Sequence, residues 1–276
     1  MRRGVLPAPA RRATIRVVKR ISRLHECTQL ILLVTAAPST AAHLTRPAEC
    51  AFDTYIPDVE ARLAKDHTIC PGDLPCVVAV NGGSWPVPGG RLHHWRAAAL
   101  VPGATAKHML ALLTDHDHLA RYYGPEVVSS RTLRNDGETA TIAMRFQKHE
   151  FITVVLDAEF ETRSALIEGG RRGFSISRST HIWQVDRPGS PQERRRPEGD
   201  DDGFLWRLNS YWNFKETPEG LRIECEAVSL TRDVPAGLGW LIAPIIQTLP
   251  RESLELTLSA TRKALTTRRS DHDRAN

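Results

Sequence analysis

Alternation of apolar and polar residues over most of residues 91–231 restricts the fold of this chain more than any other feature. It is clearest at 150–162, with Ile152, Val154 and Leu156 on one side, and at 204–215. A period of two is that of a strand with one buried face. Together with the turn signals, it predicts seven strands: 91–101, 126–133, 139–148, 150–162, 173–185, 204–215 and 221–231.

Short turns between these segments predict antiparallel pairing of consecutive strands. Asn135-Asp136-Gly137 is a strong hairpin signal, and Thr217-Pro218-Glu219-Gly220 closes the last pair. A two-residue turn at Pro218-Glu219 would pair Tyr211 with Glu226, whereas a one-residue bulge at Gly220 would change that register. Residues 186–203 hold three prolines and two runs of like charge, so we expect a long exposed loop there.

The last strong pattern is helical and covers residues 237–267. Its prolines, Pro244 and Pro250, predict a kink or a split. A single sheet needs one apolar face covered, and this helix is the element long enough to cover it. Further helices are predicted at 47–66, 105–113 and 117–123. Residues 68–91 are rich in Pro and Gly and are interpreted as a connection, with at most a short strand at 76–80.

Basic charge is concentrated at the start of the chain. The net charge is +5, but residues 1–26 alone carry +7, which leaves −2 for the other 250 residues. The folded body is therefore not basic, and a general nucleic-acid-binding surface is not expected. No apolar run reaches about 18 residues, which argues against a multi-span membrane protein.

The basic start is followed by an apolar stretch, residues 30–37, and then by small residues. This order is typical of a secretory signal peptide, with cleavage after Ala41 or Ala42. We expect export to the periplasm or the medium, and a cytoplasmic protein if the segment is only a basic arm before a short helix. The expected organisation is a leader at 1–42, a helix and connection at 43–90, the main domain at 91–267 and a polar tail at 268–276.

Five cysteines are present, and removal of the leader would leave four. An even number in an exported protein permits disulfides. Cys70 and Cys76 flank a Pro-Gly-containing loop and form the candidate pair. Cys225 lies in a strand pattern and is interpreted as a buried apolar thiol. No C-x-x-C is present, which argues against a structural zinc or redox motif.

The order strand, two short helices, six strands and one long helix resembles the helix-grip fold of the START and birch-pollen-allergen (SRPBCC, polyketide-cyclase-like) superfamily. The resemblance covers roughly residues 91–265. In detail, these stretches of sequence are similar to those of uncharacterised, exported bacterial START-like proteins. It is carried by residues 90–103, 203–212, 224–232, 237–241 and 250–254. The upstream helix, with Phe52, Tyr55 and Glu60, also resembles those proteins, whereas residues 67–89 do not.

The resemblance implies an α+β fold, with a curved seven-stranded antiparallel sheet wrapped round the C-terminal helix and an extra N-terminal helix. It implies space between sheet and helix, where an apolar ligand would sit. It implies no assigned reaction. From the strand faces, the candidate ligand-binding residues are His93, Trp95, Phe146, Trp206, Ser210, Trp212, Ala227, Leu241 and Ile245.

The leading hypothesis is a binder or carrier of a lipid or other apolar small molecule, without cofactor or metal and with at most transient membrane contact. The loop at 186–203 or the short helices at 105–123 would gate the space. The first alternative is a cyclase- or hydrolase-like enzyme in the same space, which needs an inward acid or base; His93 is the candidate. The second is an interaction module whose tryptophans fill the space. A void beneath the helix, and a titratable group inside it, distinguish the three.

Two polar patterns have simpler explanations. The run Asp115 to His118 suggests a metal site, but histidines two apart on a helix face different ways, so we expect Asp115 to cap a helix and the histidines to be solvated. On the strand 204–215, Asn209 and Tyr211 lie opposite the tryptophans and pair with glutamates of 221–231. We interpret these side chains as a polar ladder on a solvated face.

Overall fold

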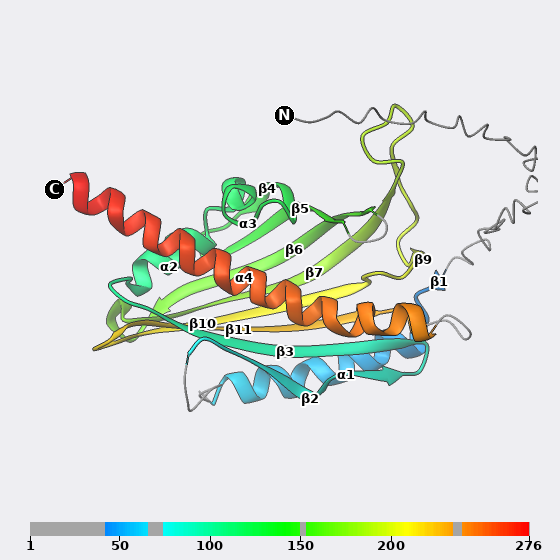
Figure 1. Ribbon diagram of the computed structural model, residues 1–276, viewed down its shortest axis with the longest axis horizontal. Helices are drawn as coiled ribbons and strands as arrows, with labels where there is room; N and C mark the ends of the chain where they lie inside the picture. The colour runs from blue at the N-terminus through cyan, green and yellow to red at the C-terminus, as the bar shows by residue number, and fades with distance from the viewer. Residues whose placement is uncertain (1–41, 66–73, 150–152, 234–238, 276) are drawn as a thin grey trace, which may run out of the picture. The chain divides into compact units, whose positions relative to one another are not determined.

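The computed structural model describes residues 42–65, 74–149, 153–233 and 239–275, and for the last helix the side chains of 248–267 (Figure 1). All elements below belong to the compact unit of residues 40–276. Its helices are α1 (Arg46–Leu63), α2 (Ala106–Leu113), α3 (Leu119–Tyr123) and α4 (Gly239–Ala275), with short 3-10 turns η1 (His116–His118) and η2 (Glu168–Gly170).

The strands build one large antiparallel sheet. Its order is β2-β3-β11-β10-β7-β6-β5-β4, with β8 paired to β7. The bounds are β2 (Cys76–Val87), β3 (Gly90–Val101), β4 (Val127–Asn135), β5 (Thr139–His149), β6 (Thr153–Ile167), β7 (Arg172–Asp186), β8 (Arg194–Arg195), β10 (Arg207–Thr217) and β11 (Gly220–Thr231). The seven predicted strands are all present, and Tyr211 pairs with Glu226 as the two-residue turn predicts.

The main difference from the prediction is β2, a twelve-residue strand in the segment interpreted as a connection. Between Ala79, opposite Trp95, and Ser84, opposite His93, the register shifts and β2 carries extra residues. Asn81, Gly82 and Gly83 have positive φ there, so the glycines fit a bulge that other residues adopt at a cost. Glycines inside a strand pattern therefore marked a bulge, not the absence of a strand.

One face of the sheet packs against α4 and α2. Leu254, Leu258 and Leu265 of α4 form a fully buried cluster with Met109 and Leu112 of α2 and with apolar side chains of β3, β10 and β11. This is the coverage that the helical pattern predicts, because the apolar stripe of the helix meets the apolar face of the strands. α4 is one continuous helix through Pro244 and Pro250, so a split is wrong, and it extends through the predicted polar tail to Ala275.

The opposite face is covered too, by α1. Thr45 caps this helix by accepting a hydrogen bond from the Ala48 amide at 3.4 Å, and Pro47 occupies its first turn. Ala48, Phe52 and Val59 bury their side chains with those of β3 and β11. Figure 1 shows α1 running beneath β3. The sheet therefore has two buried faces in this region.

The segment 186–203 is not simply a loop. It contains β8 and a second short strand, β9 (Asp200–Asp201), which pairs with β1 (Ala42–His43). Asp201 is buried and accepts hydrogen bonds from the Gly203 amide at 2.6 Å and the Trp206 indole at 3.1 Å. Within the described residues, no helix combines the length and the hydropathy needed to span a membrane.

Candidate functional site

Small side chains meet at the centre of the sheet, on the face toward α4. Ala227 of β11 lies opposite Ser210 of β10, and Ser210 lies opposite Ser177 of β7. These are central strands, where side chains are normally the most buried. All three side chains are nevertheless only half-buried. We name Ala227, Ser210 and Ser177 the small-residue row.

The neighbouring row of side chains on the same three strands is closed, in the sense that its members are buried. Cys225, Trp212 and Ser175 stand two residues further along the same three strands and are 2%, 6% and 4% exposed. Cys225 and Trp212 pack in the cluster that contains Leu254 and Leu258 of α4. Cover by α4 is thus complete over this row and incomplete over the small-residue row.

Four of the predicted ligand-binding residues border or form the open part of this face. Trp95 lies opposite Ala227, is half-buried, and contacts the α4 cluster. Its indole nitrogen is buried and has no hydrogen-bond acceptor in the described parts of the chain. Phe146 is half-buried on β5 and packs edge-on against Phe160, with ring centroids 6.1 Å apart. Ser210 and Ala227 belong to the small-residue row.

Trp206 differs from the prediction. It packs with Phe52 and Val59 of α1 and not on the face of Trp212. The physical reason is that β10 begins only at Arg207, so Trp206 precedes the strand and escapes its alternation; its amide and indole bind Leu230 O and Asp201. The side chains of Leu241 and Ile245, on the first turns of α4, lie outside the described part.

His93 is 1% exposed, and both of its ring nitrogens are bonded. Nε2 lies 2.9 Å from Thr231 Oγ1, and Nδ1 lies 2.6 Å from Ser84 Oγ. Burial, with a smaller contribution from the positive charge of Arg91, lowers the pKa of His93 to about 4. The ring is therefore neutral at pH 7.

His94 is equally buried, although adjacent residues of a strand face opposite ways. His94 is buried on the opposite face from His93 because α1 covers that face. His94 Nε2 lies 2.6 Å from Glu226 Oε1, and Tyr55 of α1 lies 2.6 Å from Nδ1. Burial lowers the pKa of His94 and outweighs the opposing effect of Glu226.

Glu226 is the centre of this second cluster. It is 1% exposed, accepts both ends of the Arg62 guanidinium, and forms an ion pair with Arg96 at 3.0 Å. Burial alone would raise its pKa, but the bonds from His94 and Arg62 outweigh burial and lower it. The cluster thus fixes α1 to β3 and β11 through a charged carboxylate, and its polar groups are occupied by one another.

The prediction of a polar ladder on a solvated face is therefore wrong about the solvent exposure of that face. Asn209, Tyr211 and Glu226 are 4%, 2% and 1% exposed. The alternation assigned them correctly to one face, and Tyr211 does bond to Glu60 of α1 at 3.1 Å. The prediction failed on solvation, because the pattern of a strand does not show which helix returns to cover its polar face.

The run Asp115 to His118 does not form the predicted arrangement either. Asp115 holds the cap position of η1 without a side-chain capping bond. Its carboxylate instead accepts from His118 Nδ1 at 2.7 Å and from the Tyr122 hydroxyl at 2.5 Å. His116 is 7% exposed and so is not solvated, whereas the side chain of His118 is 66% exposed, as predicted.

The cysteines partly fall outside the described residues. Cys76 is disulfide-bonded, but Cys70, its predicted partner, lies outside the described ranges. Cys50 is exposed and free. Cys225 is buried and free, as its strand pattern indicates, and burial raises the pKa of its thiol.

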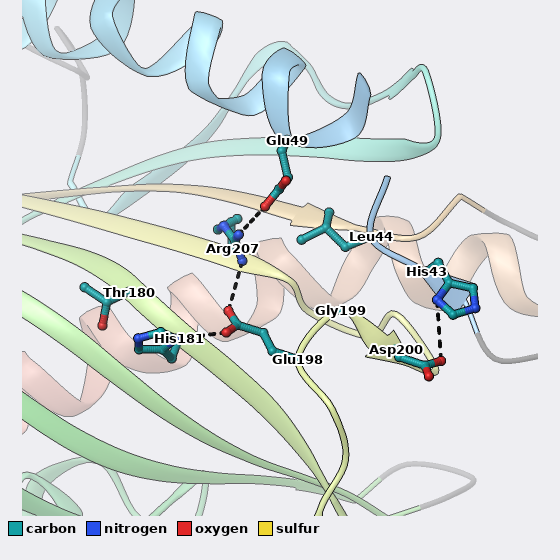
Figure 2. A pocket seen from close by; sticks show the side chains of 9 residues that line it. All are labelled: His43, Leu44, Glu49, Thr180, His181, Glu198, Gly199, Asp200 and Arg207. Carbon is teal, nitrogen blue, oxygen red and sulfur yellow. Dashed lines mark hydrogen bonds and ion pairs between the residues drawn. The ribbon is translucent and has the colours of Figure 1, made fainter. Parts of the chain in front are cut away.

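A separate polar pocket of about 480 Å³ lies at the start of α1. Figure 2 shows Arg207 between Glu49 and Glu198, which both bind it. His181 binds Glu198 at 2.8 Å. One arginine faces three carboxylates in this lining, Glu49, Glu198 and Asp200, so the pocket does not favour a negatively charged ligand. The pocket is lined by His43, Leu44, Glu49, Thr180, His181, Glu198, Gly199, Asp200 and Arg207.

No family model matches the chain, and no curated protein matches its sequence. Among solved structures, it is similar to a STAR-related lipid transfer protein from Xanthomonas axonopodis (TM-score 0.43, 15% identity, covering 70% of this chain and 99% of that one). It is similar to a START superfamily protein from Mycobacterium smegmatis (0.41, 12%, 65% and 99%). It is also similar to the Zhui aromatase/cyclase from Streptomyces sp. R1128 (0.40, 10%, 63% and 91%).

At these identities and TM-scores, none of the three carries a function over to this chain. What the chain's own elements establish is the architecture. A large antiparallel sheet holds a long C-terminal helix on one face and an N-terminal helix on the other. This is an α+β helix-grip fold.

Proposed function

We propose that this protein binds an apolar small molecule, such as a lipid, between the sheet and α4. The observation that carries the proposal is the half-burial of Ala227, Ser210 and Ser177 on central strands of the sheet. Each is small, each faces α4, and the row beside them is closed. A ligand would occupy the surface that the protein's own side chains leave uncovered.

The surroundings of the small-residue row are apolar, and they therefore favour an apolar ligand. Leu208, Met144 and Phe146 are half-buried on the same side of the sheet and belong to one apolar cluster. Burial of roughly 300 Å² of apolar ligand surface contributes on the order of 7 kcal/mol before association costs. The row itself carries no charge, so an apolar ligand would lose no ionic interaction there.

The test replaces a small side chain of the row by a large one that fills the space. Ser210→Phe and Ala227→Phe would be compared with Ser129→Phe, which places the same ring at an exposed position of β4. Each protein would be offered a mixture of lipids and examined by native mass spectrometry, and its thermal midpoint would be measured. We expect wild type and Ser129→Phe to retain a ligand and the other two to retain none, with all midpoints similar.

Either readout can contradict the proposal. If wild type retains no lipid, the row binds none of the classes offered and the proposal fails. If Ser210→Phe and Ala227→Phe unfold early, the site is already filled by protein, since overpacking a closed core costs about 1–3 kcal/mol. That second result would favour an interaction module without a cavity.

We also propose that the protein is exported. The disulfide at Cys76 supports this, since disulfides persist in oxidising compartments. Expression of the full chain in a bacterial host, followed by fractionation and N-terminal sequencing, tests the proposal. Export predicts a mature chain that begins at Ala42 or His43, whereas an intact leader in the cytoplasm would overturn it.

A further inference from the structure

A chain of hydrogen bonds links three strands beside the small-residue row. Ser84 of β2 and His93 of β3 are cross-strand partners, and Thr231 of β11 lies on the other side of His93. His93 is on the same face as Trp95, two residues before it, so the chain of bonds lies on the side of the sheet that faces α4. None of these three groups takes part in holding α1.

The hydroxyl of Thr231 determines the tautomer of the imidazole. Thr231 Oγ1 donates its hydrogen to Arg232 O at 3.0 Å, so toward His93 it can only accept. His93 Nε2 must therefore carry the hydrogen. Nδ1 then presents a lone pair, and the Ser84 hydroxyl, 2.6 Å away, donates its hydrogen to it.

This is the arrangement of a serine nucleophile, a neutral histidine base and a group that orients the base. We propose that Ser84 is an acyl acceptor that attacks carboxylic esters, with His93 as its general base. Ser84 is half-buried on β2, the edge strand of the sheet, directly after the glycine bulge, whereas the base His93 is buried.

The reaction balances without a cofactor. Ser84 Oγ bonds to the carbonyl carbon while its proton passes to His93 Nδ1. The bond from carbon to the alcohol oxygen breaks, and the alcohol leaves with the proton from His93. A water molecule then attacks the acyl group, again losing a proton to His93, and Ser84 regains its hydrogen. The sum is ester plus water giving acid plus alcohol.

A donor for the carbonyl oxygen lies nearby. The ring of Trp95 packs against Gly83, the residue before Ser84: a Cβ at Gly83 would stand 2.6 Å from Trp95 Cε2, which is bonded to the indole nitrogen. That N–H is buried and has no acceptor within the described chain. A buried donor without an acceptor is costly, and the oxygen of an attacked carbonyl would satisfy it.

Thr231, the group that orients His93, limits the expected rate of ester hydrolysis. A threonine hydroxyl holds the ring but does not neutralise an imidazolium as a carboxylate does. We therefore expect acylation by an activated ester to be fast relative to turnover of an unactivated one. The measurement is accordingly the formation of the acyl-serine.

The probe is p-nitrophenyl acetate, given to the purified full chain. Release of nitrophenolate and the mass of the intact protein report acylation, and peptide mapping locates the acetyl group. We expect an acetyl group on Ser84, mapped separately from any on the exposed thiol of Cys50. Ser84→Ala should abolish it, and His93→Gln should slow it about 100-fold.

The matched control is Ser129→Ala, an exposed serine of β4, which should acylate like wild type. Thermal melts of every variant separate loss of the fold from loss of chemistry. Acetylation spread over lysines and unchanged in Ser84→Ala would overturn the proposal. The probe has no apolar tail, so its result does not depend on whether the small-residue row retains a lipid.

Discussion

Acidification should destabilise this protein through His93, by an amount that its surroundings allow us to calculate. In the folded state the ring is buried among Ser84 of β2 and Thr231 of β11, and Arg91 on its own strand adds a positive charge, itself paired with Asp233 at 3.1 Å. These conditions lower the pKa of His93 to about 4, against about 6.5 in an unfolded chain.

The sign follows from which state binds the proton first. Between about pH 6.5 and about pH 4, the unfolded chain protonates this histidine and the folded chain does not, so acid favours unfolding. A shift of about 2.5 pKa units corresponds to about 3 kcal/mol in total. From about pH 7.5 to about pH 5, the expected loss of unfolding free energy from His93 alone is about 2 kcal/mol.

The assay is urea denaturation followed by tryptophan fluorescence, at several values between those two pH limits. Wild type would be compared with His93→Gln, which cannot titrate, and with His149→Gln, which removes an exposed histidine of β5. His94 titrates in the same direction, so the informative quantity is the difference between the wild-type and His93→Gln slopes. We expect the His93→Gln curve to be flatter by about 2 kcal/mol over the range. Equal slopes would refute a neutral, buried His93.

Two further predictions concern other parts of the fold. Glu226→Gln removes the charge that binds Arg62 and Arg96. It should lower the free energy of unfolding, measured by urea titration, by about 3 kcal/mol. A decrease below about 1 kcal/mol would mean that these charges contribute little to stability. Without reductant, iodoacetamide should modify the exposed Cys50 and leave Cys76 unmodified. Mass spectrometry should find Cys76 modified only after reduction and unfolding. Modification of Cys76 without reductant would contradict the disulfide.

Most of the fold could be predicted from the sequence because its strands are one-sided over most of their length. Alternation and turn residues placed all seven predicted strands, and the two-residue turn at Pro218-Glu219 set the register of β10 and β11 correctly. β2 was the strand missed as a full-length element. Its bulge at Gly82 and Gly83 interrupts the period, and a Pro/Gly-rich segment has the same composition whether it is a loop or a bulged edge strand.

The candidate site was only partly predictable. The positions of Ser210 and Ala227 followed from alternation, since small residues on a core face predict room. The bonds around His93 did not, because Ser84 lies in the missed strand and Thr231 is remote in sequence. Likewise the burial of Glu226 depends on α1, which is far from β11 in the chain. Strand periodicity assigns a residue to a face, but long-range packing decides what covers it.

The two faces of the sheet have different roles under the proposed ligand binding. Toward α1, the charges of Glu226, Arg62 and Arg96 satisfy one another, and such buried charges fix geometry more than they add stability. Toward α4, the small-residue row carries no charge and is only half-buried. A sheet held rigidly from behind can keep an open apolar surface in front without collapsing onto it. If that is correct, Glu226→Gln should also weaken lipid retention, although Glu226 lies on the face away from the ligand, and unaltered retention by a folded Glu226→Gln protein would separate the two faces functionally.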